Sequence, residues 1–384
     1  MTKTVSVFGS TGSIGRSALD LIAHNPDGFK LRVLTAGKNA ELLAAQAIAF
    51  KPELVVLADE TGYAKLCDLL SNYSDIKITA GRQALLDAAQ VEVDLTLAAI
   101  MGFAGLEPLL HSIQSSKAVA IANKEPLVAA GALFMDAAEK AGCQILPTDS
   151  EHNAIFQVFE PENVGSISRL ILTASGGPFR TWARDDIMAA TPAQAVNHPN
   201  WSMGAKISVD SASLMNKALE VIEAHHLFAM PEDKIDVVVH PESIVHSFVE
   251  YQDGSVLAQL GAPDMRTPIA YCLSWPERMV TSGERLDVFK LSSLNFEPLR
   301  DDVFPPVKWA HEALRSGQGA CIALNASNEV AVSHFLNKDI GFAQIYTIVE
   351  QMLEEFSGRS VSGLEDIISL DKEVRMASSN FINL

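Results

Sequence analysis

The sequence has few of the features that define several large classes of protein. Four cysteines occur in 384 residues, and no two of them form a CxxC pair. This scarcity argues against a disulfide framework and against a zinc ribbon. No apolar run reaches the roughly 18 to 20 residues that a membrane-spanning helix needs. The first residues enter a strand pattern without a leader, so we expect a cytoplasmic protein with no membrane partner.

Acidic residues outnumber basic residues in this sequence. The chain has 29 Lys and Arg against 47 Asp and Glu, which gives a net charge of -18. Nucleic acid is therefore not expected as a partner, because binding to its phosphates requires a basic surface. Hydrophobic residues make up 48% of the chain, enough for a large core. A chain of this length predicts two or three domains.

Strand-like and helix-like segments alternate along the first part of the chain. Helical patterns such as 39–50 separate short runs that are rich in β-forming residues. This alternation predicts an α/β fold with a parallel, doubly wound (Rossmann-like) sheet. The predicted strands are 4–9, 30–37, 53–59, 76–81, 94–100, 117–123 and 143–149.

The pattern changes after about residue 168. Strand-like runs, a hairpin signal at Asp253-Gly254 and one helix at about 211–228 predict an α+β domain. The chain becomes helical after residue 306, where 342–356 places its apolar residues on one helical face. We therefore predict an α/β domain, an α+β domain, a linker and a C-terminal helical domain, with boundaries at 1–149, 150–275, 276–305 and 306–384.

A glycine-rich turn follows the first predicted strand. Gly9, Gly12 and Gly15 stand in GxxGxxG order between this strand and a helical pattern. Such a turn lets the backbone approach a pyrophosphate closely and points a helix N-terminus at it. A glycine triplet alone is weak evidence, but its strand–turn–helix setting favours dinucleotide binding over a purely structural turn.

The tip of the second predicted strand distinguishes between two dinucleotides. NAD sites place an Asp or Glu there to bind the ribose 2′-hydroxyl. Here the strand is followed by Gly37, Lys38 and Asn39, with no acidic side chain at the tip. Because Lys38 would attract a 2′-phosphate, we predict NADPH rather than NADH. The alternative is that Lys38 is an ordinary exposed lysine and the cofactor is recognised elsewhere.

Polar residues follow the last two strands of the predicted sheet. Ligands of open parallel sheets bind beyond the carboxyl ends of the strands. A lysine at this edge would act on a substrate oxygen, although a surface lysine is the plainer interpretation without that setting. The two groups are Asn123, Lys124 and Glu125, and Asp149, Ser150 and Glu151; His152 comes next and receives no role.

The helix expected from about residue 212 carries a narrow polar stripe. Its other faces are apolar, which predicts a largely buried helix rather than a solvated one. Ser211, Asn216 and Lys217 offer a hydroxyl, an amide and an ammonium group, a set that can hold a phosphate. The stripe consists of Ser213, Asn216, Lys217, Glu220 and Glu223.

Three carboxylates are candidate ligands for a metal ion. Asp149, Glu151 and Glu220 offer oxygen atoms, which suit Mg²⁺ or Mn²⁺. No HxxxH or CxxC pattern indicates zinc. Sequence spacing does not bring residues 149 and 220 together, so this prediction depends on ligand type alone.

A segment at about 176–206 is rich in Gly, Pro, Trp and Asn, which is typical of a lid. Ser175 precedes two glycines that would hinge the lid, and its hydroxyl would contact an anion. Trp201 would close over a substrate and exclude water, or it would anchor an ordered loop. The other candidate lid residues are His198, Met203 and Gly204.

Eight motifs stand out along the chain: GSTGSIG, AGKN, ANKE, LPTDSEHNAIFQ, TASGGPF, HPNWSMG, DSASLMNKALE and LNASNEVAV. Their sequence and order resemble the 1-deoxy-D-xylulose 5-phosphate reductoisomerase family, from residue 5 to about 356. Ala218 stands where the family pattern has glycine, within NKGLE. Ser327 stands where the family commonly has alanine, within NAANE.

The resemblance implies a homodimer with an NADPH-binding domain, a catalytic domain that also binds metal and dimerises, and a C-terminal helical domain. NADPH would be held by Thr11, Gly12, Ser13, Ile14, Gly37, Lys38, Asn39, Asn123, Glu125 and Gly204. Mg²⁺, Mn²⁺ or Co²⁺ would be bound by Asp149, Glu151 and Glu220, and the substrate phosphate by Ser175, Ser211, Asn216 and Lys217. The sugar would be contacted by Lys124, Ser150, Glu151 and His198, with Trp201 and Met203 above it.

The implied reaction has two parts. The carbon skeleton of 1-deoxy-D-xylulose 5-phosphate would rearrange to an aldehyde, by retro-aldol and aldol steps or by an α-ketol shift. NADPH would then reduce this aldehyde to 2-C-methyl-D-erythritol 4-phosphate, in the methylerythritol phosphate route to isoprenoids. Lys124 would stabilise negative charge on oxygen, while Asp149, Glu151 and Glu220 would hold the metal ion.

Two other functions are compatible with a glycine-loop domain followed by an α+β domain. A semialdehyde- or homoserine-type dehydrogenase is the first. The semialdehyde type needs a nucleophilic cysteine, and Cys143 has no activating neighbour in the sequence. The second is a non-catalytic NADPH-binding protein, which would need neither the carboxylates nor the phosphate-binding residues.

Overall fold

The computed structural model describes residues 2–201 and 203–383. Ser202, within the predicted lid, lies outside the described residues. The chain forms two compact units that interleave along the sequence. The first unit comprises Met1–Asn123, Phe134–Asn153 and Asp264–Glu284, and the second comprises Lys124–Leu133, Ala154–Pro263 and Arg285–Leu384.

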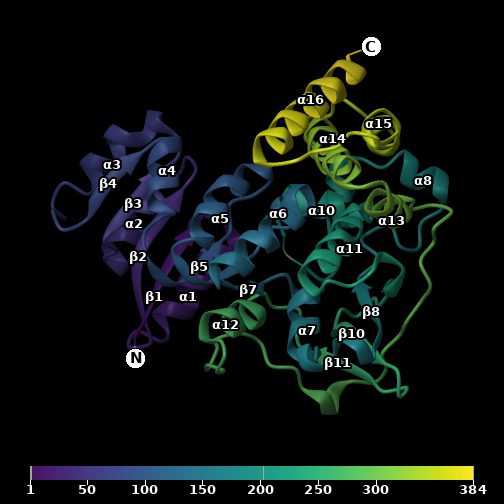
Figure 1. The fold of residues 1–384 in the computed structure, drawn as a ribbon, viewed down its shortest axis with the longest axis horizontal. Helices are drawn as coiled ribbons and strands as arrows, with labels where there is room; N and C mark the ends of the chain where they lie inside the picture. The colour runs from purple at the N-terminus through teal and green to yellow at the C-terminus, as the bar shows by residue number, and fades with distance from the viewer. Residues whose placement is uncertain (1, 202, 384) are drawn as a thin grey trace. The chain divides into compact units, whose positions relative to one another are not determined.

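The first unit is built on a seven-stranded sheet with the order β4-β3-β2-β1-β5-β6-β7 (Figure 1). All neighbouring strands pair in parallel, and each strand predicted in this region is present. The predicted α/β fold is therefore confirmed. The strands are β1 (Lys3–Phe8), β2 (Phe29–Ala36), β3 (Leu54–Leu57), β4 (Lys77–Ala80), β5 (Val93–Ala98), β6 (Ser116–Ile121) and β7 (Gln144–Pro147).

Helices connect these parallel strands, as right-handed crossovers require. The helices are amphipathic or apolar and bury residues such as Leu19 and Leu43. They are α1 (Ser13–Ala23), α2 (Ala40–Phe50), α3 (Tyr63–Leu69), α4 (Arg82–Ala88), α5 (Leu106–Ile113) and α6 (Glu125–Ala141), and α12 (Arg266–Ser274) returns to this unit from later in the chain.

The second unit contains a mixed four-stranded sheet with the order β11-β10-β8-β9. Strand β8 pairs in parallel with β9 and antiparallel with β10, and β10 pairs antiparallel with β11. The predicted hairpin lies between β10 and β11, where Gly254 has a φ of 87°. The strands are β8 (Ile167–Ala174), β9 (Ile235–Val239), β10 (Val245–Tyr251) and β11 (Val256–Leu260).

The prediction of a single helix at about 211–228 is wrong. Two helices occupy this region, α10 (Ala205–Ala212) and α11 (Met215–Phe228). The break falls at Leu214, which has a left-handed φ of 59°. A left-handed conformation ends a right-handed helix, and a leucine adopts it only at an energetic cost. Periodicity did not reveal the break because apolar residues continue at helical spacing through it.

The C-terminal helices share one hydrophobic core with the four-stranded sheet of the second unit. Phe342 lies at the centre of this contact, with its ring centroid 5.4 Å from that of Phe179 and 5.6 Å from that of Phe335. Figure 1 shows α14 beside α10 in this unit. The helices are α13 (Pro306–Ser316), α14 (Gln318–Asn337), α15 (Phe342–Phe356) and α16 (Leu364–Ile382).

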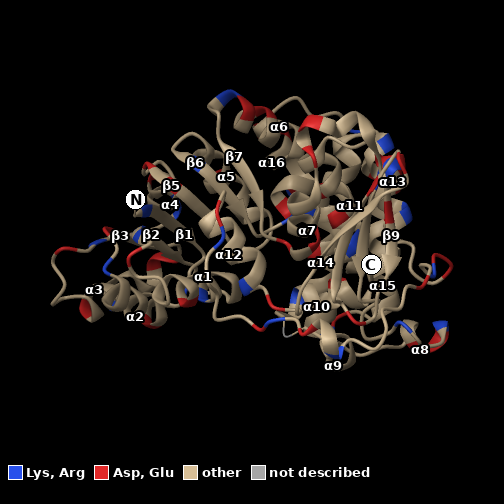
Figure 2. Ribbon diagram, turned by 90° about the horizontal axis from the view of Figure 1, so that it is seen from below, with Lys and Arg blue, Asp and Glu red and all other residues tan. Residues whose placement is uncertain are grey.

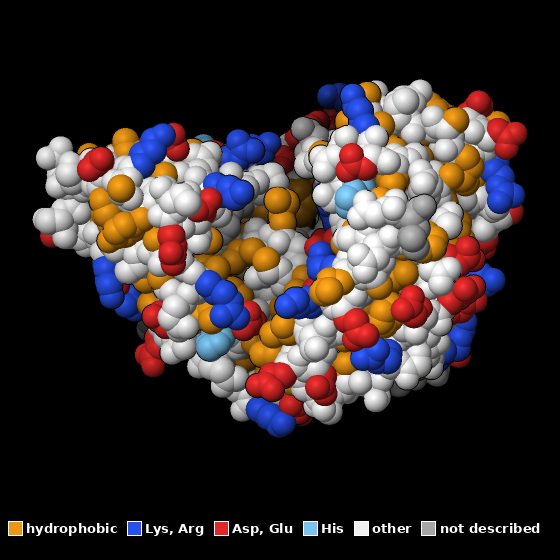
Figure 3. Space-filling view, turned by 90° about the horizontal axis from the view of Figure 1, so that it is seen from above, with side chains coloured by type: hydrophobic (Ala, Val, Ile, Leu, Met, Phe, Trp, Pro, Cys, Tyr) orange, Lys and Arg blue, Asp and Glu red, His pale blue; other side chains and the backbone are white. Residues whose placement is uncertain are grey.

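Charged residues of both signs are mixed over the molecule. Lys and Arg lie among Asp and Glu along the ribbon (Figure 2) and on the face seen in Figure 3. Among the helices in the described part of the chain, none is both long enough and apolar enough to cross a membrane.

Replacing Gly15 by alanine tests the packing of the glycine turn. A Cβ atom at Gly15 would lie 2.4 Å from the carbonyl oxygen of Gly9. We expect Gly15→Ala to lower the free energy of unfolding by about 1–3 kcal/mol, as overpacking does. Gly12→Ala is the matched control, because its Cβ would lie 3.4 Å from the same oxygen. Equal thermal melting of the two variants would contradict this packing.

Candidate active site

The N-terminus of α1 is exposed and lacks a side-chain cap. Gly12 is the N-cap, and the first turn carries no acidic residue. Gly12 and Ser13 are exposed, and Thr11 and Ile14 are half-buried. The first N–H groups of a helix and its positive dipole end favour an anion. The turn therefore fits a pyrophosphate, the group that the sequence predicts there.

The tip of β2 presents a cation and open space. Gly37, Lys38 and Asn39 are exposed, and a Cβ at Gly37 would have no atom within 4 Å. The Asn39 carboxamide caps α2 by accepting a hydrogen bond of 2.9 Å from the backbone N–H of Leu42. Asp59, at the end of β3, accepts hydrogen bonds from Thr61, and these lower the pKa of its carboxyl group. Lys38 thus stands in a position open to a 2′-phosphate.

Lys124 is buried at the start of α6 and points at the polar stripe of α11. Its Nζ donates a hydrogen bond of 2.8 Å to Oδ1 of Asn216 and lies 3.7 Å from Oε1 of Glu220. Asn123 is half-buried just before it. Glu125, predicted to contact the cofactor, is buried and accepts a hydrogen bond of 2.7 Å from Lys206.

Glu220 is the most enclosed carboxylate of the stripe, with 1% of its side chain exposed. It accepts hydrogen bonds from Nδ2 of Asn216 and from Nζ of Lys217, one helical turn earlier. A buried carboxylate requires such donors, because an uncompensated charge in the interior is costly. Lys124 and Lys217 both lie beside Glu220 and compensate its charge.

The structure places the three predicted metal ligands together. Asp149 precedes α7 (Ser150–Val158), whose first turn carries Glu151, and Glu220 lies on α11. One oxygen of each lies within 4.8 Å of those of the other two. The hydroxyl of Ser150 donates a hydrogen bond to Glu151. Three carboxylates at this separation are a donor set for a hard divalent cation.

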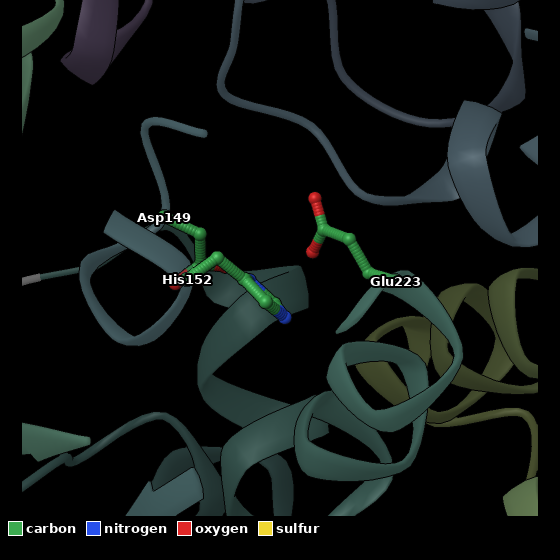
Figure 4. Close-up of side chains that lie close together, drawn as sticks. All are labelled: Asp149, His152 and Glu223. Atoms are coloured by element: carbon green, nitrogen blue, oxygen red, sulfur yellow. The ribbon is translucent and has the colours of Figure 1, made fainter. Parts of the chain in front are cut away.

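A second group shares Asp149. Its ligand atoms and those of His152 and Glu223 also lie within 4.8 Å of one another. Figure 4 shows the Glu223 side chain extending from α11 toward Asp149 and His152. Glu223 lies on the predicted polar stripe and His152 follows the predicted ligands, but neither residue was assigned a role from the sequence. Glu223 comes one helical turn after Glu220, and His152 comes three residues after Asp149. This spacing is the pattern in the sequence from which their position near the site could have been predicted.

The loop after β8 lies against the end of α10. Gly177 has a φ of 65°, and a Cβ there would lie 2.6 Å from the carbonyl oxygen of Ser211. Ser175 precedes this glycine, and its hydroxyl accepts a hydrogen bond of 3.2 Å from the Gly177 N–H. The break at Leu214 then starts α11, so Asn216 and Lys217 occupy its first turn. The loop that carries Ser175 thus lies against the Ser211 backbone, shortly before α11 begins.

His198 organises the described part of the predicted lid. Its Nδ1 accepts hydrogen bonds from the backbone N–H groups of Asn200, at 3.2 Å, and Trp201, at 3.0 Å. The ring proton therefore resides on Nε2, which donates to the Ser175 hydroxyl at 2.9 Å. Burial lowers the pKa of His198, in keeping with this neutral tautomer. Met203 is half-buried, and Gly204 is exposed as the N-cap of α10.

The chain matches three family models. A model described as 1-deoxy-D-xylulose 5-phosphate reductoisomerase matches residues 5–131, and one for the C-terminal domain of this enzyme matches 145–228. A further model, described as the DXP reductoisomerase C-terminal domain, matches 260–377. The 1-deoxy-D-xylulose 5-phosphate reductoisomerase of Rhodospirillum centenum is 52% identical over 99% of this chain and 94% of its own length.

The chain belongs to the 1-deoxy-D-xylulose 5-phosphate reductoisomerase family. The enzyme of Zymomonas mobilis is 48% identical over 98% of this chain and 97% of its own length.

Solved structures of reductoisomerases have the same fold. The Zymomonas mobilis enzyme in complex with NADPH superposes with a TM-score of 0.94 at 47% identity, covering 100% of this chain and 99% of that one. A DOX-P reductoisomerase in complex with NADPH, fosmidomycin and magnesium gives a TM-score of 0.95 at 43% identity, covering 100% and 98%.

Cys143 does not have the surroundings of a nucleophile. Burial raises the pKa of its thiol to about 11. A thiol with this pKa stays protonated at neutral pH, whereas the nucleophilic form is the thiolate. The semialdehyde-type alternative therefore lacks its essential residue at this position.

Proposed function

We propose that this chain converts 1-deoxy-D-xylulose 5-phosphate to 2-C-methyl-D-erythritol 4-phosphate with NADPH and a divalent cation, as a reductoisomerase of isoprenoid precursor biosynthesis. The observation that carries this proposal is the meeting of Asp149, Glu151 and Glu220 beside the buried Lys124. The substrate is inferred from the family to which the chain belongs, and these side chains offer the functional groups that its conversion needs.

The carboxylates Asp149, Glu151 and Glu220 hold Mg²⁺, Mn²⁺ or Co²⁺. Their hard oxygen donors fit these ions, and the second group with His152 and Glu223 offers a nitrogen ligand beside the same Asp149. When bound, the cation polarises carbonyl and hydroxyl oxygens of the sugar, and NADPH supplies the hydride.

Lys124 stabilises negative charge that develops on a substrate oxygen. Its Nζ is held 2.8 Å from Asn216 and 3.7 Å from Glu220, so it enters the reaction already oriented. Ser150 and Glu151 lie in the first turn of α7, where they contact the sugar hydroxyls. A preoriented ammonium group is effective because it needs no reorganisation when the charge appears.

The substrate phosphate lies between the loop after β8 and the first turn of α11. Ser175 and Ser211 supply hydroxyls, and Asn216 and Lys217 supply an amide and an ammonium group at a helix N-terminus. His198, Trp201 and Met203 lie on the lid segment and cover the sugar. Binding energy from the phosphate, which does not react, then serves to orient the reacting carbons.

NADPH lies with its pyrophosphate at Thr11, Gly12, Ser13 and Ile14, the N-terminal turn of α1. Lys38, flanked by Gly37 and Asn39, receives the 2′-phosphate and selects NADPH over NADH. Asn123 and Glu125, and Gly204 at the start of α10, complete the cofactor set that the family resemblance implies.

The functional protein is a homodimer. Strand β11 is the edge of its sheet, and it exposes Val256 by 50%, Leu257 by 40% and Leu260 by 40%. An apolar edge strand favours pairing with another chain. Phe289, which is fully exposed, adds apolar surface to the same unit.

The homodimer is tested by sedimentation velocity, which should give twice the chain mass. Leu257→Lys places a charge on the apolar edge strand and should shift the measured mass toward that of the monomer. A monomeric wild-type protein would contradict the proposed dimer.

The reaction takes place in the cytoplasm. All four cysteines are free, as expected in a reducing compartment. The substrate and NADPH are both small soluble molecules, so the proposal requires no membrane and no nucleic-acid partner.

The proposed activity is tested by NADPH oxidation with 1-deoxy-D-xylulose 5-phosphate and Mg²⁺ or Mn²⁺. We expect oxidation that requires substrate and metal, stops on chelation and yields 2-C-methyl-D-erythritol 4-phosphate by mass spectrometry. NADH should support a much lower kcat/KM. Folded protein that oxidises no NADPH with either metal would contradict the proposal.

Replacing Gly177 by alanine tests the phosphate site. The added Cβ would push against the carbonyl of Ser211, so we expect kcat/KM for the substrate to fall about tenfold, equivalent to ~1.4 kcal/mol. Gly254→Ala is the matched control, since Gly254 also has positive φ but has no atom within 4 Å of an added Cβ. Kinetics of the Gly177 variant that equal those of the Gly254 variant would exclude this role.

A further inference from the structure

Lys206 joins two carboxylates in the second unit. It lies in the first turn of α10, and its Nζ is 2.7 Å from Oε1 of Glu125 and 2.7 Å from Oδ2 of Asp210. The side chains of Glu125 and Asp210 are 9% and 2% exposed, whereas that of Lys206 is 30% exposed. A cation thus links the start of α6 to α10.

The same group reaches the C-terminal helices. The other oxygen of Asp210 accepts a hydrogen bond of 2.9 Å from Nδ2 of Asn328, on α14. Glu329, the next residue, accepts hydrogen bonds from Asn325 at 3.2 Å and from Arg375 of α16 at 3.0 Å. The contacts therefore continue from α6 through α10 to α14 and α16.

Carboxylates outnumber cations in this group, which makes Lys206 important for its charge balance. Glu125, Asp210 and Glu329 face Lys206, and although burial works to lower the pKa of Lys206, these three groups raise it above its ordinary value. The ammonium group therefore stays charged. Loss of its charge would remove the cation that both Glu125 and Asp210 contact in a largely buried place.

Both partners of Lys206 are adjacent in sequence to residues that handle the substrate. Glu125 follows Lys124, which contacts Asn216. Asp210 precedes Ser211, whose carbonyl lies against Gly177. A shift of either carboxylate would move one of these neighbours through a single peptide unit.

We infer that Lys206 is a positioning residue for the reaction, acting through Glu125 and Asp210 to align Lys124 with the phosphate site of α10 and α11. Because Asn328 of α14 donates a hydrogen bond to Asp210, the C-terminal helices also contribute to this alignment. The inference rests on the proposed function, because alignment is measured by turnover.

The charge at position 206 is tested by comparing Lys206→Met, which removes it, with Lys206→Arg, which keeps it. At saturating substrate, NADPH and Mg²⁺, we expect kcat to fall at least tenfold in the methionine variant and to stay within threefold in the arginine variant. Lys308→Met is the matched control, because that side chain is 71% exposed and lies 3.6 Å from Glu312. It should retain wild-type kcat.

A double variant separates positioning from scaffolding. In Lys206→Met with Asp210→Asn, the carboxylate that the first change deprives of its cation is removed, so kcat should recover severalfold relative to Lys206→Met. A purely structural role predicts a further loss, together with lower thermal stability. Asn328→Ala tests the same contacts without removing a charge, and should lower kcat about threefold, as expected for one hydrogen bond.

The result that supports the inference is a kcat loss in Lys206→Met that is avoided in Lys206→Arg and is relieved by Asp210→Asn. A folded Lys206→Met with kcat within twofold of wild type would overturn it, as would a double variant slower than the single one. If the methionine variant does not fold, unchanged kcat in Asn328→Ala would overturn it. A wild-type protein without turnover would contradict the proposed function itself.

Discussion

The buried carboxylate of Glu220 is the constraint on which the site depends. With 1% of its side chain exposed, it is ionised only where donors and cations surround it. Asn216 and Lys217 approach from its own helix, and Lys124 from the start of α6. The compensation of this charge therefore holds the start of α6 against α11.

Backbone strain and close packing determine the structure around Ser211 and the start of α11. Leu214 adopts a left-handed conformation that costs a leucine roughly 1–2 kcal/mol. The break that it creates allows α11 to begin with Asn216 and Lys217 in its first turn. Gly177 brings the loop after β8 against Ser211, an approach that no other residue permits without displacement. Strain of this kind is typical of sites that must hold a ligand in one geometry.

The sequence predicted the fold better than it predicted the contacts of the site. Alternating strands and helices identified the seven-stranded sheet, since each strand is a local pattern. The helix break at Leu214 was missed because leucine is a good helix former and its hydrophobic period continues. The pair of Lys206 with Glu125, which are 81 residues apart, was also missed, because no local pattern records a contact between two distant charges. Ligand type made Asp149, Glu151 and Glu220 candidate ligands, but their distances from one another could come only from the fold.

We propose that Asp149, Glu151 and Glu220 hold the divalent cation, and Mn²⁺ binding followed by electron paramagnetic resonance tests this assignment. Glu220→Gln should weaken Mn²⁺ binding by at least tenfold, the loss expected when a ligand is removed. Glu223→Gln, the matched change one turn later on α11, should weaken it much less. Full Mn²⁺ affinity in Glu220→Gln, with binding lost in Glu223→Gln, would contradict this account and assign the ion to Asp149, His152 and Glu223.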